Sequence, residues 1–169
     1  MEIQNKIKIL ILDDEKQFTE ELGGFFVGSD YEAFEANTAE EGKKILNNNE
    51  IDLLILDVRL PGVNGLDILK EVKIQYPGME VIIISAHGDM HTVITAMRLG
   101  AFDYLRKPFR YIDIQIAIER TQKFVMLQRK LKQSEEKNSL ISKTLEEKIN
   151  RQFIGVSPQI QEVFEKAIT

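Results

Sequence analysis

The fold of this chain is decided by one short stretch, IDLLILD at residues 51–57. An unbroken apolar run in this stretch ends on a carboxylate, Asp57, and the turn signals Pro61-Gly62 and Asn64-Gly65 follow it. An apolar run bounded in this way predicts a strand buried on both faces, as in a parallel sheet. Ligands bind at the C-terminal ends of such strands, so Asp57 is a candidate functional residue. Aspartate also begins many turns, so position alone leaves both interpretations open.

Further strands and helices are predicted on both sides of this stretch. Strands are predicted at residues 7–12, 31–36, 81–84 and 102–105, and helices at about residues 15–27, 38–49, 64–76 and 90–99. Five strands that alternate with helices predict an α/β fold, a doubly wound five-stranded parallel sheet with right-handed crossovers. We place this domain at residues 5–122 and expect the flavodoxin-like strand order 2-1-3-4-5.

Composition excludes several classes of protein. The 169 residues are 43% apolar and 29% charged, which is typical of a soluble globular protein. The longest apolar runs are far shorter than the ~20 residues of a membrane helix, and no secretion signal is recognisable, so we expect a cytoplasmic protein without membrane contact. The absence of cysteine excludes disulfides and thiolate metal sites. The net charge of -5 argues against a nucleic-acid-binding surface.

The C-terminal part follows a different pattern, because no strand is predicted for some 40 residues after about Ile112. Alternating steps of three and four residues connect Phe124, Leu127, Leu131, Ser134, Asn138, Ile141 and Leu145. This mostly apolar seam, in a sequence rich in Lys, Glu and Gln, predicts a long helical coiled-coil linker at residues 123–150. Asn138 on the seam is expected to fix the register and favour a homodimer. A single amphipathic helix packed on its own domain remains the alternative.

Polar side chains follow the predicted strands at their C-terminal ends. Three carboxylates, Asp13, Asp14 and Asp57, are expected to repel one another unless a cation lies among them. Oxygen ligands favour a hard divalent ion, Mg²⁺ or Mn²⁺. A carboxylate beside such an ion can attack phosphorus, and the Ser85 hydroxyl and the Lys107 ammonium are suitable partners for phosphoryl oxygens. Each residue alone has an ordinary structural explanation, but their joint placement at strand ends favours a site.

Several motifs, in this order along the chain, carry a resemblance to a known family. They are Asp13-Asp14, Leu56-Asp57 with Leu60-Pro61-Gly62 and Gly65, Ser85-Ala86, residues 100–105 (GAFDYL) and Lys107-Pro108-Phe109. Over about its first 120 residues the sequence resembles the receiver domain of two-component response regulators.

The resemblance implies a role for each matching residue. Asp57 is expected to accept a phosphoryl group from a partner histidine kinase, in a self-catalysed reaction that does not make the chain a conventional enzyme. Asp14 and Asp57 are expected to bind Mg²⁺ with the backbone carbonyl of Arg59, while Asp13 acts through a bridging water. The switch pair of the family corresponds to two positions of this chain, Ser85 and Tyr104.

The C-terminal tail carries a second, shorter resemblance. Residues 153–167 resemble the opening of the AAA+ ATPase domain of sigma-54-dependent transcription activators, so residues 151–169 are predicted to be an N-terminal fragment of that domain. The sequence has no G-x-x-x-x-G-K-[ST] phosphate loop and no helix-turn-helix, so we expect this chain neither to hydrolyse ATP nor to bind nucleic acid directly. Its partners in a full-length protein are then the AAA+ domain and the sigma-54 RNA polymerase.

Two other functions fit parts of the pattern. A stand-alone receiver would act by phosphorylation-dependent protein contact, with the helical tail as the docking element. A haloacid-dehalogenase-like phosphatase also uses an aspartyl nucleophile with Mg²⁺, but it needs a second aspartate two residues later. Here Arg59 occupies that position, which disfavours the phosphatase.

Overall fold

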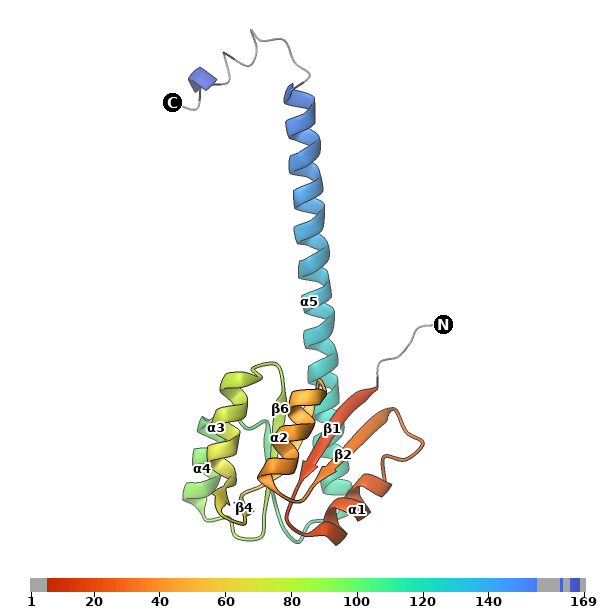
Figure 1. The fold of residues 1–169 in the computed structure, drawn as a ribbon, viewed down its shortest axis with the longest axis vertical. Coiled ribbons are helices and arrows are strands. Elements are labelled where there is room, and N and C mark those ends of the chain that lie inside the picture. Colours follow the sequence, from red (N-terminus) through yellow and green to blue (C-terminus); the bar gives the residue numbers. More distant parts are fainter. Residues whose placement is uncertain (1–5, 155–161, 163–164, 168–169) are drawn as a thin grey trace. The chain divides into compact units, whose positions relative to one another are not determined.

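The computed structural model describes residues 6–154, 162 and 165–167, so most of the predicted fragment 151–169 lies outside the described residues. The chain divides into two compact units, residues 1–125 and 126–169. The elements, shown in Figure 1, are β1 (Ile7–Leu12), α1 (Lys16–Gly24), β2 (Tyr31–Ala36), α2 (Ala39–Asn48), β3 (Leu53–Asp57), β4 (Arg59–Leu60), β5 (Val63–Asn64), α3 (Gly65–Gln75), β6 (Glu80–Ser85), α4 (Met90–Arg98), β7 (Asp103–Arg106) and α5 (Tyr111–Ile154).

The central sheet has five parallel strands in the order β2-β1-β3-β6-β7. This confirms the predicted order 2-1-3-4-5, because β4 and β5 form a separate two-stranded antiparallel ribbon. Sequence analysis predicted only a turn there. The ribbon reverses at Gly62, whose φ of 73° lies in the left-handed region that glycine adopts without steric cost.

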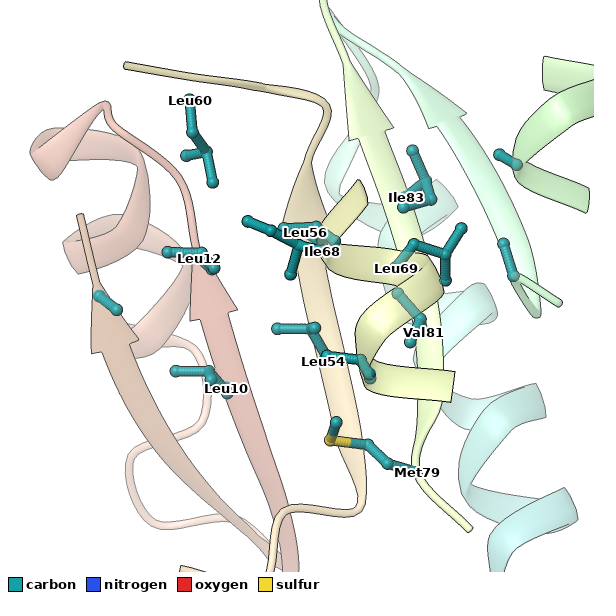
Figure 2. Packing of buried hydrophobic residues seen from close by; sticks show 14 residues of the cluster. Leu10, Leu12, Leu54, Leu56, Leu60, Ile68, Leu69, Met79, Val81 and Ile83 are labelled. Atoms are coloured by element: carbon teal, nitrogen blue, oxygen red, sulfur yellow. The ribbon is translucent and has the colours of Figure 1, made fainter. Parts of the chain in front are cut away.

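Alternation along the buried strands divides the core between the two faces of the sheet. In β1, Ile9 and Ile11 pack with α1 and α5, while Leu10 and Leu12 pack with α2, α3 and α4. Figure 2 shows the second face, where Leu69 of α3 lies over the strands of the sheet. Because helices cover both faces, the inner strands β1, β3 and β6 are buried along nearly their whole length, as the IDLLILD stretch predicted, whereas the edge strands β2 and β7 carry more polar residues.

Some predicted boundaries differ from the structure. The first helix ends at Gly24 rather than near residue 27, because Phe26 N–H bonds to the Gly23 carbonyl (3.0 Å) in a tighter turn. The second helix begins at Ala39, within the predicted range 38–49, and Thr38 is its N-cap residue. The Thr38 hydroxyl accepts from Glu41 N–H at 3.1 Å, and the Glu41 carboxylate accepts from Asn37 N–H at 2.8 Å.

The first part of α5 belongs to the core of the first unit. Ile114, Ala117, Ile118 and Val125 are buried against the face of the sheet that α1 also covers. From Met126 to Arg151, nearly all side chains of α5 are exposed. Among the helices in the described ranges, none combines the length and the apolar character that a membrane span requires.

Candidate functional site

The register of the parallel sheet brings the predicted site residues to one edge. Leu12 of β1 lies opposite Leu56 of β3, so the next residues, Asp13 and Asp57, come side by side. On the other side of β3, Asp57 pairs with Ile84, and Ser85 follows directly. Two strands with adjacent C-terminal ends therefore deliver two carboxylates to the point where the strand order reverses.

Lys107 directly follows β7, the edge strand on the other side of β6, and its side chain forms ion pairs with both carboxylates. Its backbone N–H donates to the Ser85 carbonyl at 2.8 Å, which fixes the chain where β7 ends. Its Nζ lies 2.5 Å from Asp13 Oδ2, 3.4 Å from Asp57 Oδ2 and 3.5 Å from Glu15 Oε1. The side chains of Lys107, Asp13 and Asp57 are at most 13% exposed, so the ion pairs of Lys107 with the two aspartates are poorly screened by solvent, whereas Glu15 is exposed.

The three acidic residues form a compact group. Asp13, Asp14 and Asp57 each offer a carboxylate oxygen, and these oxygens lie within 4.8 Å of one another. Asp13 and Asp57 are buried, whereas Asp14 is exposed to solvent. One lysine does not neutralise three carboxylates, and an all-oxygen donor set with an open side suits a hard divalent cation such as Mg²⁺. The residues present therefore fit the cation that the sequence predicted.

Burial and charge act in opposite directions on the two central groups. Burial raises the pKa of Asp57, the Asp13 charge adds to this, and the hydrogen bond from Arg59 N–H (3.0 Å) and the Lys107 charge oppose it. Burial alone lowers the pKa of Lys107, but its hydrogen bond to Asp13 and the surrounding carboxylates outweigh burial and leave that pKa raised. Lys107 is thus a cation at neutral pH, and ionised Asp57 carries an unfavourable desolvation cost.

Two contacts of Lys107 involve residues that sequence analysis did not assign to the site. Nζ lies 4.3 Å from the centroid of the Phe18 ring, a cation–π geometry. Glu15 is the third acidic residue, after Asp13 and Asp57, that forms an ion pair with Lys107. Phe18 lies within the helix predicted at about residues 15–27, and the sequence analysis gave it no role in the site. Both residues lie in or just before the first turn of α1, which is the segment that follows Asp13-Asp14.

The predicted switch residues are Ser85, the last residue of β6, and Tyr104 in β7. Both lie next to the loop that connects β6 to α4. Ser85 is fully buried, and its hydroxyl donates to the His87 carbonyl (3.0 Å) and accepts from His87 N–H (3.2 Å). The Tyr104 ring packs on the cluster under α3 and α4, and its hydroxyl is buried with no hydrogen-bond partner among the described residues. A Cβ atom on Gly88 would lie 2.3 Å from Tyr104 Oη, so the lack of a side chain at Gly88 leaves room for the ring.

We expect Gly88→Ala to displace the Tyr104 ring, because no Cβ contact as short as 2.3 Å is tolerated. The readout is the ¹⁹F resonance of Tyr104 in fluorotyrosine-labelled protein, assigned with Tyr104→Phe. Gly78→Ala is the matched control, since a Cβ there has no atom within 4 Å. A Tyr104 resonance that shifts no more in Gly88→Ala than in Gly78→Ala would refute this steric account.

The chain is a doubly wound α/β domain, and an acidic group that contacts a lysine lies at the carboxyl edge of its sheet, where the strand order reverses. The chain belongs to the response regulator receiver domain family, whose sequence pattern matches residues 9–119. Receiver domains bind Mg²⁺ at an acidic pocket, and this structure has a group of three acidic residues, Asp13, Asp14 and Asp57, at the carboxyl edge of its sheet.

Individual relatives agree with this assignment. The DNA-binding transcriptional regulator NtrC of Proteus hauseri is 36% identical over 75% of this chain and 25% of its own length. The crystal structure of NtrX from Brucella abortus with ATP has a TM-score of 0.68 at 32% identity, covering 73% of this chain and 28% of that chain. A response regulator receiver domain from Clostridium thermocellum has a TM-score of 0.66 at 38% identity, covering 71% and 97%. The chain thus spans about a quarter of the length of its NtrC relative.

Proposed function

We propose that this chain accepts a phosphoryl group on Asp57 from a sensor histidine kinase and passes the resulting change to a downstream domain. The observation that carries the proposal is the position of the Asp57 carboxylate. It is buried at the sheet edge, 3.4 Å from Lys107 Nζ and grouped with Asp13 and Asp14. A carboxylate held beside a lysine and a cation site is suited to attack phosphorus.

The proposed reaction uses the residues at this edge in distinct roles. An Asp57 carboxylate oxygen forms a bond to phosphorus while the bond from phosphorus to the kinase histidine nitrogen breaks. Mg²⁺, held by Asp14, Asp57 and the Arg59 carbonyl, with Asp13 acting through a bridging water, would supply the positive charge that offsets the repulsion between the anionic phosphoryl group and the carboxylates. Lys107 meets one phosphoryl oxygen with its ammonium group, because its raised pKa keeps it protonated.

Ser85 connects the phosphoryl group to the proposed switch. Its hydroxyl donates to the His87 carbonyl, so donating to a phosphoryl oxygen requires that this hydrogen bond break. The loop carrying His87 and Gly88 is then released above the Tyr104 ring. A local electrostatic event is thereby coupled to the surface around α4, which is how a charge-adding modification biases a two-state element.

The reaction is tested by the intact mass of the protein after incubation with a small acyl phosphate. We expect the wild type to gain one phosphoryl group in the presence of Mg²⁺ and none when a chelator is present. Asp57→Asn is expected to gain none in either condition. If the wild type stays unmodified under conditions that modify another receiver domain, or if Asp57→Asn is modified equally, the proposed role of Asp57 is wrong.

We further propose that the downstream domain is the AAA+ ATPase of a sigma-54-dependent activator. The support is the resemblance of residues 153–167 together with relatives named NtrC and NtrX, each much longer than the matched region. In this proposal residues 5–122 are the receiver, residues 123–150 are the linker and residues 151–169 begin the ATPase. This assigns DNA contact and sigma-54 RNA polymerase to other parts of the full-length protein.

The linker is proposed to be a dimeric coiled coil. The seam residues Leu127, Leu131, Ile141 and Leu145 are between 53% and 57% exposed, and most other residues of α5 after Val125 are polar. A polar helix of this kind gains most of its stability from packing its apolar stripe, and a second copy offers the same stripe in register. Phe124, the first predicted seam residue, lies 5.5 Å from the Phe102 ring, so it also packs on its own domain.

We expect Leu145→Glu to weaken the dimer by roughly tenfold or more, because it places a charge in an apolar seam. Leu140→Glu is the matched control, since Leu140 is 68% exposed but lies off the seam. Sedimentation equilibrium gives the dimer dissociation constant of each variant. Equal dissociation constants for the two variants would contradict the predicted seam. A dimer affinity unchanged by phosphorylation would contradict its proposed role in transmission.

A further inference from the structure

We propose that Asn37 is a positioning residue for the acidic group, holding the backbone of Asp13 at the spacing that cation binding and phosphoryl transfer need. This inference rests on the proposed function of the same site. Asn37 directly follows β2, the neighbour of β1, and its side chain donates to a backbone carbonyl and a hydroxyl rather than to a carboxylate of the site. It contributes instead through hydrogen bonds to the segments that carry those groups.

The Asn37 side-chain amide joins two elements. Its Nδ2 donates to the Asp13 carbonyl at 2.8 Å and to the Thr19 hydroxyl at 3.0 Å. Thr19 is fully buried in α1, and its hydroxyl donates to the Lys16 carbonyl at 2.9 Å, so it is an acceptor toward Asn37. Through these two hydrogen bonds, the Asn37 side chain links the end of β1 to the first turn of α1.

The backbone of Asp13 is held on both sides as a result. Its N–H donates to the Ala36 carbonyl at 3.1 Å, and its C=O accepts from Asn37. Its carboxylate then accepts from Glu15 N–H at 2.9 Å and from Lys107. Since Asp14 is the next residue, the path of this short segment sets the positions of two of the three carboxylates.

Asn37 is itself held in place. Its backbone N–H donates to the Glu41 carboxylate at 2.8 Å, and Glu41 belongs to the capping arrangement at the start of α2. A side chain whose own backbone is fixed loses little freedom when it makes further hydrogen bonds. Asn37 thus transmits the rigid packing of β2 and α2 to the segment that carries Asp13 and Asp14.

Removing the Asn37 amide leaves the Asp13 carbonyl and the Thr19 hydroxyl each without a donor. Residues that orient metal ligands from outside the coordination shell typically change metal affinity or activity by ~10–100-fold when mutated. A displacement of reacting groups by about 1 Å lowers rates by a similar factor. We therefore expect a functional loss well beyond the loss of stability.

The test compares the wild type, Asn37→Ala and the matched control Asn48→Ala in the same assays. Asn48 makes the same kind of bond, from Nδ2 to the Lys44 carbonyl at 2.8 Å, at the far end of α2. The measurements are Mg²⁺ affinity by calorimetry and the acyl-phosphate reaction split into KM and kcat. We expect Asn37→Ala to weaken Mg²⁺ binding ~10-fold and lower kcat ~10–100-fold, and Asn48→Ala to change neither.

A second pair of variants keeps the inference testable if Asn37→Ala folds poorly. Thr19→Ser keeps the hydroxyl that accepts from Asn37 and is expected to retain wild-type Mg²⁺ affinity. Thr19→Val keeps the shape without the hydroxyl and is expected to weaken Mg²⁺ binding in the direction of Asn37→Ala. Equal Mg²⁺ affinities for Thr19→Ser and Thr19→Val would overturn the inference.

The two levels of the proposal fail in different ways. If the wild type gains a phosphoryl group but folded Asn37→Ala matches it in Mg²⁺ affinity and kcat, the positioning role is wrong and the proposed function stands. If the wild type gains no phosphoryl group, the proposed function fails. Mg²⁺ affinity then decides the role of Asn37 in cation binding alone, and equal affinities in wild type and variant refute that as well.

Discussion

Asp57→Asn is expected to make the metal-free protein more stable than the wild type at about neutral pH. The pKa of Asp57 is raised in the folded state, chiefly by burial, so the folded state holds this proton more tightly than the unfolded state. Stability therefore falls as pH rises from the ordinary aspartate pKa through the raised one, and the full deficit is present above it. Asparagine has the same shape as aspartate but no charge, so the substitution removes this loss of folding stability.

In the presence of Mg²⁺ we expect the wild type to be more stable than Asp57→Asn. A cation that binds only the folded state stabilises it by about 2.7 kcal/mol at a hundredfold excess over Kd. The wild type gains this in full, whereas Asp57→Asn, lacking one carboxylate, gains less. Each kcal/mol corresponds to a shift in Tm of about 2–4 °C for a chain of this size.

Thermal unfolding with and without Mg²⁺, over a series of pH values, measures both effects. Asp67→Asn is the control, because Asp67 is an exposed aspartate in the first turn of α3 and its neutralisation is expected to cost ~0.3–1 kcal/mol. The advantage of Asp57→Asn is expected to shrink as pH falls below the raised pKa. A metal-free Asp57→Asn protein that melts below the wild type at neutral pH would contradict the electrostatic account.

Lys107→Met is expected to be strongly destabilising and to abolish most phosphoryl uptake. The lysine is 13% exposed and pairs with Asp13, which is fully buried, and with Asp57. Removing one partner of a buried ion pair typically costs about 3–5 kcal/mol, because the remaining charge is left unpaired. Methionine keeps most of the aliphatic stem beside Phe18, so the loss reports on the charge rather than on packing.

Two responses separate this charge effect from general damage. The stability deficit of Lys107→Met is expected to shrink in acid, where the carboxylates are protonated, and to shrink on addition of Mg²⁺. Lys73→Met is the control, because Lys73 pairs with buried Glu80 at 3.5 Å at the opposite end of β6. It is expected to lose stability but to keep phosphoryl uptake. Loss of uptake in both variants to the same extent would contradict a specific role for Lys107.

Most of the fold follows from local sequence patterns. The apolar runs that end at Leu12, Asp57 and Ser85 are strands, and parallel pairing then places their C-terminal ends at one edge. That is why Asp13, Asp57 and Lys107 could be assembled from the sequence alone. These residues required only a knowledge of strand ends, whereas Arg59 and Tyr104 were assigned through the family resemblance.

The contacts that sequence analysis missed join elements far apart in the chain. Phe18 and Lys107 meet because α1 and the end of β7 lie side by side, which no local periodicity records. Asn37 was missed for a different reason. It directly follows a predicted strand, the same signal that selected Asp13, but an uncharged amide at a strand end drew no chemical interpretation. Polar uncharged residues at strand ends deserve the same consideration as carboxylates.

Periodicity likewise identifies an apolar face without identifying what covers it. The apolar residues of α5 include Val125, which is buried in the receiver core, and the predicted seam residue Leu127, which is exposed. The change between Val125 and Met126 marks the border between the two compact units, three residues beyond the predicted end of the receiver. The assignment of residues 123–150 to a linker stays a prediction.

The most direct test of the account is to locate the phosphoryl group itself. After reaction with an acyl phosphate and Mg²⁺, borohydride reduces an aspartyl phosphate to homoserine, and peptide fragmentation then identifies the modified residue. We expect the mark on Asp57 alone, with none on Asp13 or Asp14. A modified Asp13 or Asp14, or a phosphoryl group on a histidine of this chain with Asp57 unmodified, would contradict the central claim.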